Sequence, residues 1–196
     1  LPGPTQMVIA LSEWLQGYLI YMLGGIFAFV TVFGQARMRS KAFHFHTDML
    51  ALKLPVFGNI IKKVAVARFT RTLGTMISSG VPILDGLDIV AKTAGNMVIE
   101  DELQTTRSAI SEGKTIAEPL QGSKIFPGMM VQMVSVGEET GSMEVMLTKI
   151  ADFYDDEVDG AVAGLTAMLE PIMMVFMGGS IGTILIAMYL PIFTIA

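Results

Sequence analysis

The sequence predicts an all-α membrane protein in which a cytoplasmic bundle of about six helices lies between two transmembrane helices. The 196 residues are 52% hydrophobic and only 16% charged, whereas about a quarter of the residues of an average soluble domain are charged. Every charged residue falls between Glu13 and Glu170, so both ends of the chain are apolar. Between these ends the apolar residues follow helical spacings, and no alternating strand pattern of useful length interrupts them.

Two uncharged stretches are long enough to cross a bilayer. Residues 14–36 carry no charge, and neither do residues 171–196. A hydrocarbon core of about 30 Å requires about 20 helical residues. We therefore expect transmembrane helices at residues 14–36 and 168–193, with an external loop at residues 1–13 and an external tail at residues 194–196.

The basic residues predict the orientation of the chain. Residues 1–36 and 150–196 contain no Lys or Arg, whereas eight of the 13 basic residues lie between Arg37 and Arg71. Short basic segments next to a transmembrane helix favour the cytoplasmic side of the membrane. We therefore expect residues 37–167 to form a cytoplasmic helical domain, with both ends of the chain outside.

Helix signals dominate this predicted cytoplasmic domain. An apolar repeat ends near Gly80, Pro82 suits the first turn of the next helix, and Asn96 is placed to cap a third. The remaining boundaries are expected at a capping box and at turn residues: Thr115 with Glu118, Pro127, Gly141 and Ser142. No break follows before Glu170 and Pro171, so the last helix of the domain should feed almost continuously into the second span.

Few residues indicate catalysis or a cofactor. The chain has no cysteine, and His44 and His46 are two positions apart, which places them on different faces of a helix. Gly113-Lys114-Thr115 resembles the end of a phosphate-binding loop, but Ser108 stands where that pattern requires Gly and no strand precedes it. The net charge of −5 argues against nucleic acid as a partner. We expect no catalytic residue, no metal, no cofactor and no enzymatic activity.

An acidic segment is the main candidate for contact with a partner. Residues 138–159 contain eight acidic residues and one base, Lys149. Such a surface can dock a basic patch of another protein, and a solvated helix face is the plain alternative. The candidate contact residues are Glu138, Glu139, Asp152, Asp155, Asp156 and Glu157.

Two pairs of glycines are candidates for helix packing. The members of each pair are four positions apart, a spacing that allows helices in a membrane to approach closely. Ordinary packing within the chain is the alternative. The candidate residues are Gly160, Gly164, Gly178 and Gly182.

Several segments together resemble the type II secretion protein F domain family. They are ARFTRTLGTMISSGVPILDGLDIVAKTAGN, FPGMMVQMVSVGEETGSMEVML, ADFYDDEVD and LEP, and the similarity runs from the first span to YLPIF. The resemblance implies an architecture of two cytoplasmic helical repeats with three membrane spans. This sequence then corresponds to the C-terminal portion of such a protein. The start at Leu1, without an initiator Met and in a Pro/Gly segment, is accordingly interpreted as a cut in an external loop.

The resemblance implies a mechanical function in the bacterial inner membrane. Such a multi-pass platform protein of type IV pili or type II secretion would couple a cytoplasmic assembly ATPase to the polymerisation of pilin or pseudopilin subunits. The implied partners are that ATPase, those subunits, other inner-membrane components of the machine and further copies of the chain in a homo-oligomer. A fragment of a polytopic transporter is the alternative, and it predicts charged or broken helices inside the spans.

Overall fold

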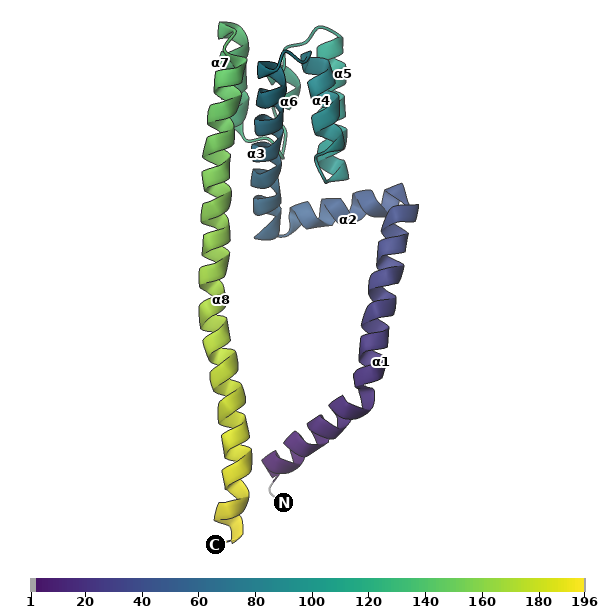
Figure 1. The fold of residues 1–196 in the computed structure, drawn as a ribbon, viewed down its shortest axis with the longest axis vertical. Coiled ribbons are helices and arrows are strands. Elements are labelled where there is room, and N and C mark those ends of the chain that lie inside the picture. Colours follow the sequence, from purple (N-terminus) through teal and green to yellow (C-terminus); the bar gives the residue numbers. More distant parts are fainter. Residues whose placement is uncertain (1–2, 196) are drawn as a thin grey trace. The chain divides into compact units, whose positions relative to one another are not determined.

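The computed structural model describes residues 3–195, which form eight α-helices and no strand (Figure 1). The chain divides into two compact units. The bundle unit comprises residues 40–163, and the terminal unit comprises residues 1–39 and 164–196. The helices are α1 (Gly3–Arg39), α2 (Lys41–Lys53), α3 (Phe57–Ser78), α4 (Ile83–Lys92), α5 (Met97–Ser111), α6 (Ala117–Leu120), α7 (Gly128–Thr140) and α8 (Met143–Ile195).

The helices of the terminal unit expose apolar side chains around their circumference. Ile20 is 78% exposed, Phe27 is 72% exposed and Val175 is 77% exposed. Gln16–Arg39 in α1 and Met143–Tyr189 in α8 both contain windows that are long and apolar enough to cross a membrane. A helix that is apolar on all sides requires an apolar environment. The two predicted apolar helices are therefore present.

The loop expected at residues 1–13 is wrong for its described part, because α1 already begins at Gly3. Pro4 lies in the first turn, where a helix does not use the missing N–H group. The residues that follow contain no further helix breaker before Gly17. The tail expected at residues 194–196 is likewise helical as far as Ile195. Residues 1, 2 and 196 lie outside the described residues.

Most predicted boundaries in the bundle unit agree with the structure. The Asn96 side chain accepts hydrogen bonds from the N–H groups of Val98 and Ile99, at 3.0 and 3.3 Å. Gly141 ends α7 in the left-handed conformation, with φ of 67°, which a glycine adopts without a Cβ penalty. The capping box is only half formed: Thr115 accepts from the Glu118 N–H at 3.3 Å, while the Glu118 carboxylate lies 3.7 Å from Lys114.

The start of the bundle unit differs from the sequence prediction. Helix α2 was not anticipated as a separate element, although Ser40 caps it by accepting from the Phe43 N–H at 3.3 Å. Helix α3 begins at Phe57. This start lies well before Val66, the first residue of the apolar repeat that was predicted to end near Gly80. The turn between α2 and α3 is so tight that a Cβ on Gly58 would collide with the carbonyl group of Leu52.

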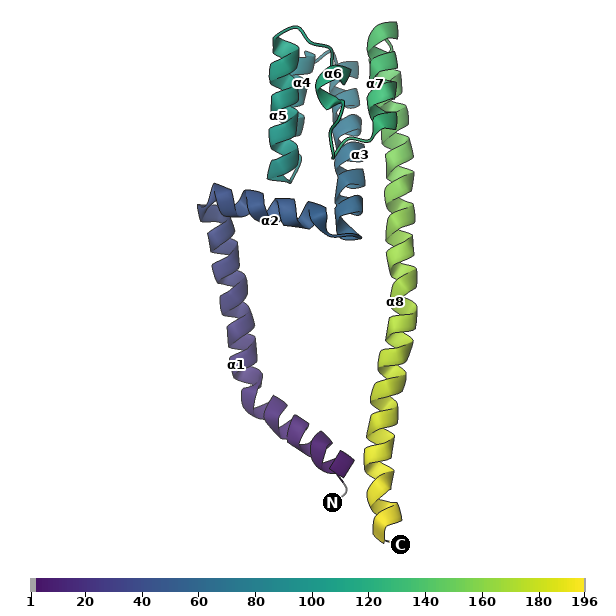
Figure 2. The ribbon, with the colours of Figure 1, turned by 180° about the vertical axis from the view of Figure 1, so that it is seen from behind.

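All helices of the bundle unit share one hydrophobic core. The rings of Phe69 in α3 and Phe126, just before α7, have centroids 5.4 Å apart. Helix α8 lies beside α3 and α7 in both views (Figures 1 and 2). Glycines allow these close approaches: a Cβ on Gly74 would lie 3.3 Å from Leu147 Cβ, and one on Gly137 would lie 3.1 Å from Met146 Cβ.

Helix α8 belongs to both units, because it runs without interruption from Met143 to Ile195. The predicted continuity into the second apolar segment is thus confirmed. Pro171 does not end the helix. Proline removes one backbone hydrogen bond, a loss that apolar membrane helices tolerate through local adjustment.

Candidate functional site

Helices α3 and α8 bring oppositely charged side chains together on the surface of the bundle unit. Arg71 Nη2 in α3 donates to Asp152 Oδ1 at 2.7 Å and to Asp155 Oδ2 at 2.6 Å in α8. On the same two helices, Lys63 Nζ in α3 donates to Glu157 Oε2 in α8 at 2.6 Å. We call these five residues the α3–α8 charged face. Three of the six predicted contact residues therefore meet here.

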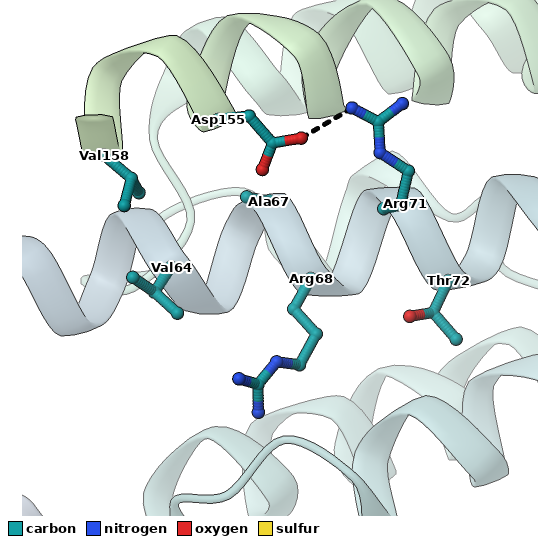
Figure 3. A pocket seen from close by; sticks show the side chains of 7 residues that line it. All are labelled: Val64, Ala67, Arg68, Arg71, Thr72, Asp155 and Val158. Atoms are coloured by element: carbon teal, nitrogen blue, oxygen red, sulfur yellow. Dashed lines mark hydrogen bonds and ion pairs between the residues drawn. The ribbon is translucent and has the colours of Figure 1, made fainter. Parts of the chain in front are cut away.

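A groove of about 270 Å³ lies beside this face, lined by residues of α3 and α8. Figure 3 shows Asp155 extending from α8 to Arg71, whereas Arg68 points away from α8. Arg68 is exposed, and no acidic residue in the described part of the chain forms an ion pair with it. The groove therefore has the paired Arg71 on one side and the solvent-accessible guanidinium of Arg68 on the other.

The electrostatics of the charged face indicate a surface role. The hydrogen bonds that the Arg71 guanidinium donates to Asp155 and then to Asp152 raise its pKa above the ordinary value. The side chains are nonetheless 45% exposed for Arg71, 62% for Asp152 and 54% for Asp155. Ion pairs this exposed contribute only about 0–1 kcal/mol each to stability. These charges are thus held in place without being required for the fold.

The two glutamates at the end of α7 have different environments. The half-buried Glu138 carboxylate accepts from the Ile116 N–H through both oxygens, at 3.0 and 2.9 Å, and so caps the start of α6. Glu139 is exposed and accepts only from Ser135 Oγ at 3.2 Å among the described residues. Glu138 therefore has a structural function that the sequence did not indicate, and Glu139 is the freer of the two.

The other predicted site residues are open to the surroundings. Asp156 is exposed, and no base within the described residues pairs with it. A Cβ added to any of the four candidate glycines would meet no side chain within 4 Å, namely at Gly160, Gly164, Gly178 and Gly182. Their contact with other helices remains a prediction.

Sequence reasoning missed two kinds of residue. Lys63 and Arg71 lie about 80–95 positions from their acidic partners, so no local pattern couples them. Asp48 is 3% exposed, and its carboxylate accepts from the Met97 N–H at 2.8 Å. The sequence contained one indication of its importance: Asp48 is the only acid in residues 14–84.

Within the described residues, no three His, Asp or Glu side chains are grouped to hold a metal ion.

A helical bundle that continues directly into an apolar helix of membrane-spanning length defines a class of membrane-anchored helical proteins. The family described as type II secretion system (T2SS), protein F matches residues 69–191. The chain is 57% identical over 196 residues to the type IV pilus assembly protein PilC of Myxococcus xanthus, a match that covers 100% of this chain and 47% of that protein.

Two relatives from Pseudomonas aeruginosa complete the comparison. Its type IV pilus assembly protein PilC is 42% identical over 193 residues, covering 98% of this chain and 52% of that protein. Its type II secretion system protein F is 28% identical over 199 residues, covering 100% of this chain and 48% of that protein. The chain thus belongs to the type II secretion system protein F family, as predicted, and spans about half the length of the curated relatives it matches. The matches give no support to a transporter fragment.

Proposed function

We propose that this chain is part of an inner-membrane platform protein that couples a cytoplasmic assembly ATPase to the polymerisation of pilin subunits into a type IV pilus. The observation that carries the proposal is the continuity of α8 from the core of the bundle unit into the apolar segment. A pilus is favoured over a secretion system because identity to the two pilus proteins is 57% and 42%, against 28% for the secretion protein.

The continuity of α8 supplies a physical route for force. Leu147 and Ile150 are fully buried in the bundle core, whereas Val175 in the same helix is 77% exposed. The helix has 53 residues, which corresponds to a length of about 80 Å. Because every turn is held by backbone hydrogen bonds, a displacement of the bundle would move the apolar segment with it.

The acidic surface supports a protein partner on the cytoplasmic side. Glu139 and Asp156 are exposed, and the acids of α8 outnumber the two bases that α3 contributes to the charged face. A basic patch on the ATPase or on another platform subunit would complement this surface and would mainly affect encounter rate and specificity. ATP hydrolysis is assigned to the partner, and the platform itself catalyses no reaction.

The proposed membrane topology supports the same assignment. The basic residues between Arg37 and Arg71 favour the cytoplasmic side for the bundle unit, where an ATPase would have access. The chain has no native cysteine, so single cysteines can be labelled without background. Ser12→Cys and Ser111→Cys should react with a membrane-impermeant reagent from opposite sides of the membrane. Reaction of both from one side would contradict this topology.

The coupling proposal is tested by interrupting α8 between its two parts. Ala163→Pro in the full-length protein should kink the helix by removing a hydrogen bond and crowding the preceding turn. We expect loss of surface pili at normal protein level in the membrane. Pro171→Ala, which regularises the same helix, is the matched control and should leave pilus number unchanged. Normal piliation of the Ala163→Pro strain would contradict force transmission through a continuous α8.

A further inference from the structure

Helix α2 presents an exposed apolar face. Leu50 is 64% exposed, Leu54 is 46% exposed and Phe57, just beyond the turn, is 58% exposed. We define the outer face of α2 by six exposed residues, which recur at helical spacing and continue into the turn: His46, Leu50, Lys53, Leu54, Val56 and Phe57. Apolar groups of this size cost free energy when they remain in water.

The fold holds this face outward. Helix α2 lies crosswise to α3 (Figures 1 and 2) and contacts α3 and α5 through its other side. On that side the buried Asp48 accepts from the Met97 N–H, and its own carbonyl accepts from Asn96 Nδ2 at 3.4 Å. Leu52 packs against the hydrophobic core. The helix therefore cannot rotate to bury Leu50 and Leu54 without breaking these contacts.

The chain connects this helix directly to an apolar helix of membrane-spanning length. Helix α1 ends at Arg39 and α2 begins at Lys41, with Ser40 alone between them. Consecutive Cα atoms are about 3.8 Å apart, so the first turn of α2 starts within a few ångströms of the end of α1. If α1 crosses the membrane, as the proposed function requires, α2 begins at the membrane surface.

The charge of this region matches an anionic lipid surface. Arg39, Lys41 and Lys53 lie in or next to α2, whereas Lys63 and Arg71 in α3 are paired with acids of α8. Asp48 is the only acid in residues 14–84. Because Asp48 is buried and hydrogen-bonded, the outer face of α2 itself exposes no acidic group. Anionic headgroups attract such basic segments, while the apolar side chains enter the boundary with the acyl chains.

We propose that α2 is an interfacial helix whose outer face lies in the headgroup region of the bilayer that α1 crosses. Leu50, Leu54 and Phe57 would insert toward the acyl chains, and Lys41 and Lys53 would contact anionic headgroups. The bundle unit would then be fixed to the membrane surface at a second place besides α8. This inference rests on the proposed membrane topology and adds an orientation of the bundle to it.

Site-directed spin labelling of the full 196-residue chain tests the proposal. Single nitroxides would be placed at Leu50→Cys and Leu54→Cys, at Val30→Cys in α1 and at Ser111→Cys at the end of α5. The chains would be reconstituted into vesicles of phosphatidylcholine and phosphatidylglycerol. Collisions with dissolved oxygen report lipid contact, and collisions with a water-soluble nickel chelate report water contact.

We expect the labels at residues 50 and 54 to collide with oxygen and to be protected from nickel, and the label at residue 111 to show the reverse. Nickel access at residues 50 and 54 equal to that at residue 111, with residue 30 in lipid, would overturn the interfacial helix and leave the span intact. Protection from both reagents would indicate a protein occupant, such as a second copy, and would also overturn it. Nickel access at residue 30 would overturn the proposed topology itself.

A charge variant provides an independent measurement. Leu50→Glu with Leu54→Glu should abolish the nickel protection of a label at Phe57→Cys, because two carboxylates in the boundary region are costly and repel anionic lipid. Ile89→Glu, which replaces a 42% exposed apolar residue of α4, is the matched control and should leave that protection unchanged. Equal protection in both variants would overturn the proposal. An unchanged unfolding midpoint in detergent shows that each variant is folded.

Discussion

The two parts of α8 use the same residue types in opposite ways. Leu147 and Ile150 are fully buried in the bundle unit, whereas Leu169 is 57% exposed and Ile172 is 61% exposed in the terminal unit. In the first part apolar positions form one stripe and acidic residues occupy the opposite side. In the second part apolar residues surround the helix, and the last charge is Glu170.

The environment of an apolar residue can therefore be inferred from its neighbours on the helix. A stripe flanked by carboxylates requires protein on one side and water on the other. An apolar circumference requires lipid on all sides not covered by protein. Substitutions in the two parts of α8 should therefore have different effects on the stability of the bundle, even where the same residue type is exchanged.

The largest expected effect comes from removing a buried side chain in the first part. Leu147→Ala leaves a cavity in the core and should lower the free energy of unfolding of the bundle by about 2–5 kcal/mol. Leu169→Ala, the matched change in the second part, should leave it nearly unchanged. Thermal unfolding of both variants in the same detergent measures the difference. Equal losses would show that the two parts of α8 share one environment after all.

Two glycines of the bundle unit, one packed in α7 and one open in α8, provide a comparison with a smaller expected effect. A Cβ on Gly137 would lie 3.1 Å from Met146 Cβ and 3.2 Å from Met143 Cα, which is backbone and cannot easily move. Gly137→Ala should therefore destabilise the bundle by about 1–3 kcal/mol. Gly160→Ala meets nothing within 4 Å and should preserve or slightly raise stability, because alanine favours the helix.

The number of pili on cells that carry Gly160→Ala tests whether Gly160 contacts another helix. Reduced pilus number at normal stability would support the prediction that Gly160 contacts another helix of the assembly. Normal pilus number would leave it as an ordinary exposed glycine. A strain carrying Gly137→Ala serves as the comparison, since its pilus number should follow the amount of folded protein.

Much of the fold follows from the sequence because its signals are local. The apolar stretches, the cap at Asn96 and the left-handed turn at Gly141 each depend on residues within a few positions of one another. The extent of α1 was missed, although no helix breaker lies between Pro4 and Gly17. The existence of α2 was missed because its apolar residues do not form a single clear stripe, even though Ser40 and Pro55 mark its ends. Helix α2 in particular is apolar on both sides, one packed on the bundle and one exposed.

The candidate site was less accessible to sequence reasoning because its contacts are long-range. The acids of α8 were identified, but their pairing with Arg71 depends on how α3 and α8 pack. Glu138 and Glu139 are adjacent and chemically identical, and only the fold brings the Ile116 N–H to one of them. Sequence alone therefore could not separate a structural carboxylate from an exposed one.

These two glutamates provide the third prediction. Glu138→Ala removes the acceptor of the Ile116 N–H and should cost about 0.5–2 kcal/mol of stability, as the loss of a helix cap does. Glu138→Gln keeps an acceptor oxygen and should cost less. Glu139→Ala should change stability by less than about 0.5 kcal/mol. A lower pilus number in Glu139→Ala, at a normal amount of protein, would support a partner contact. If Glu139→Ala were less stable than Glu138→Ala, the structural assignment of Glu138 would be contradicted.

The smallest expected effect is a change in how the stability of the bundle unit depends on pH. The ammonium group of Lys92, 2.6 Å away, and then the amide of Gln104 lower the pKa of the Asp88 carboxyl below its ordinary value of 3.8. The unfolded chain therefore takes up this proton at a higher pH than the folded chain does. The stability that Asp88 contributes is fully present above pH 3.8 and is lost as the pH falls through the lowered value.

Asp88→Asn should remove this pH dependence while leaving the bundle folded at neutral pH. The difference in unfolding midpoint between pH 6 and pH 3 should therefore be smaller, by a modest amount, in Asp88→Asn than in the unmodified chain. The effect is small because the Asp88 carboxylate is partly open to solvent and is paired with the exposed Lys92 at the surface. The described terminal unit has only Glu13 and Glu170 as acidic residues, so acid should act mainly on the bundle. An equal or larger pH response of Asp88→Asn would show that Lys92 and Gln104 do not hold this carboxylate in the folded protein.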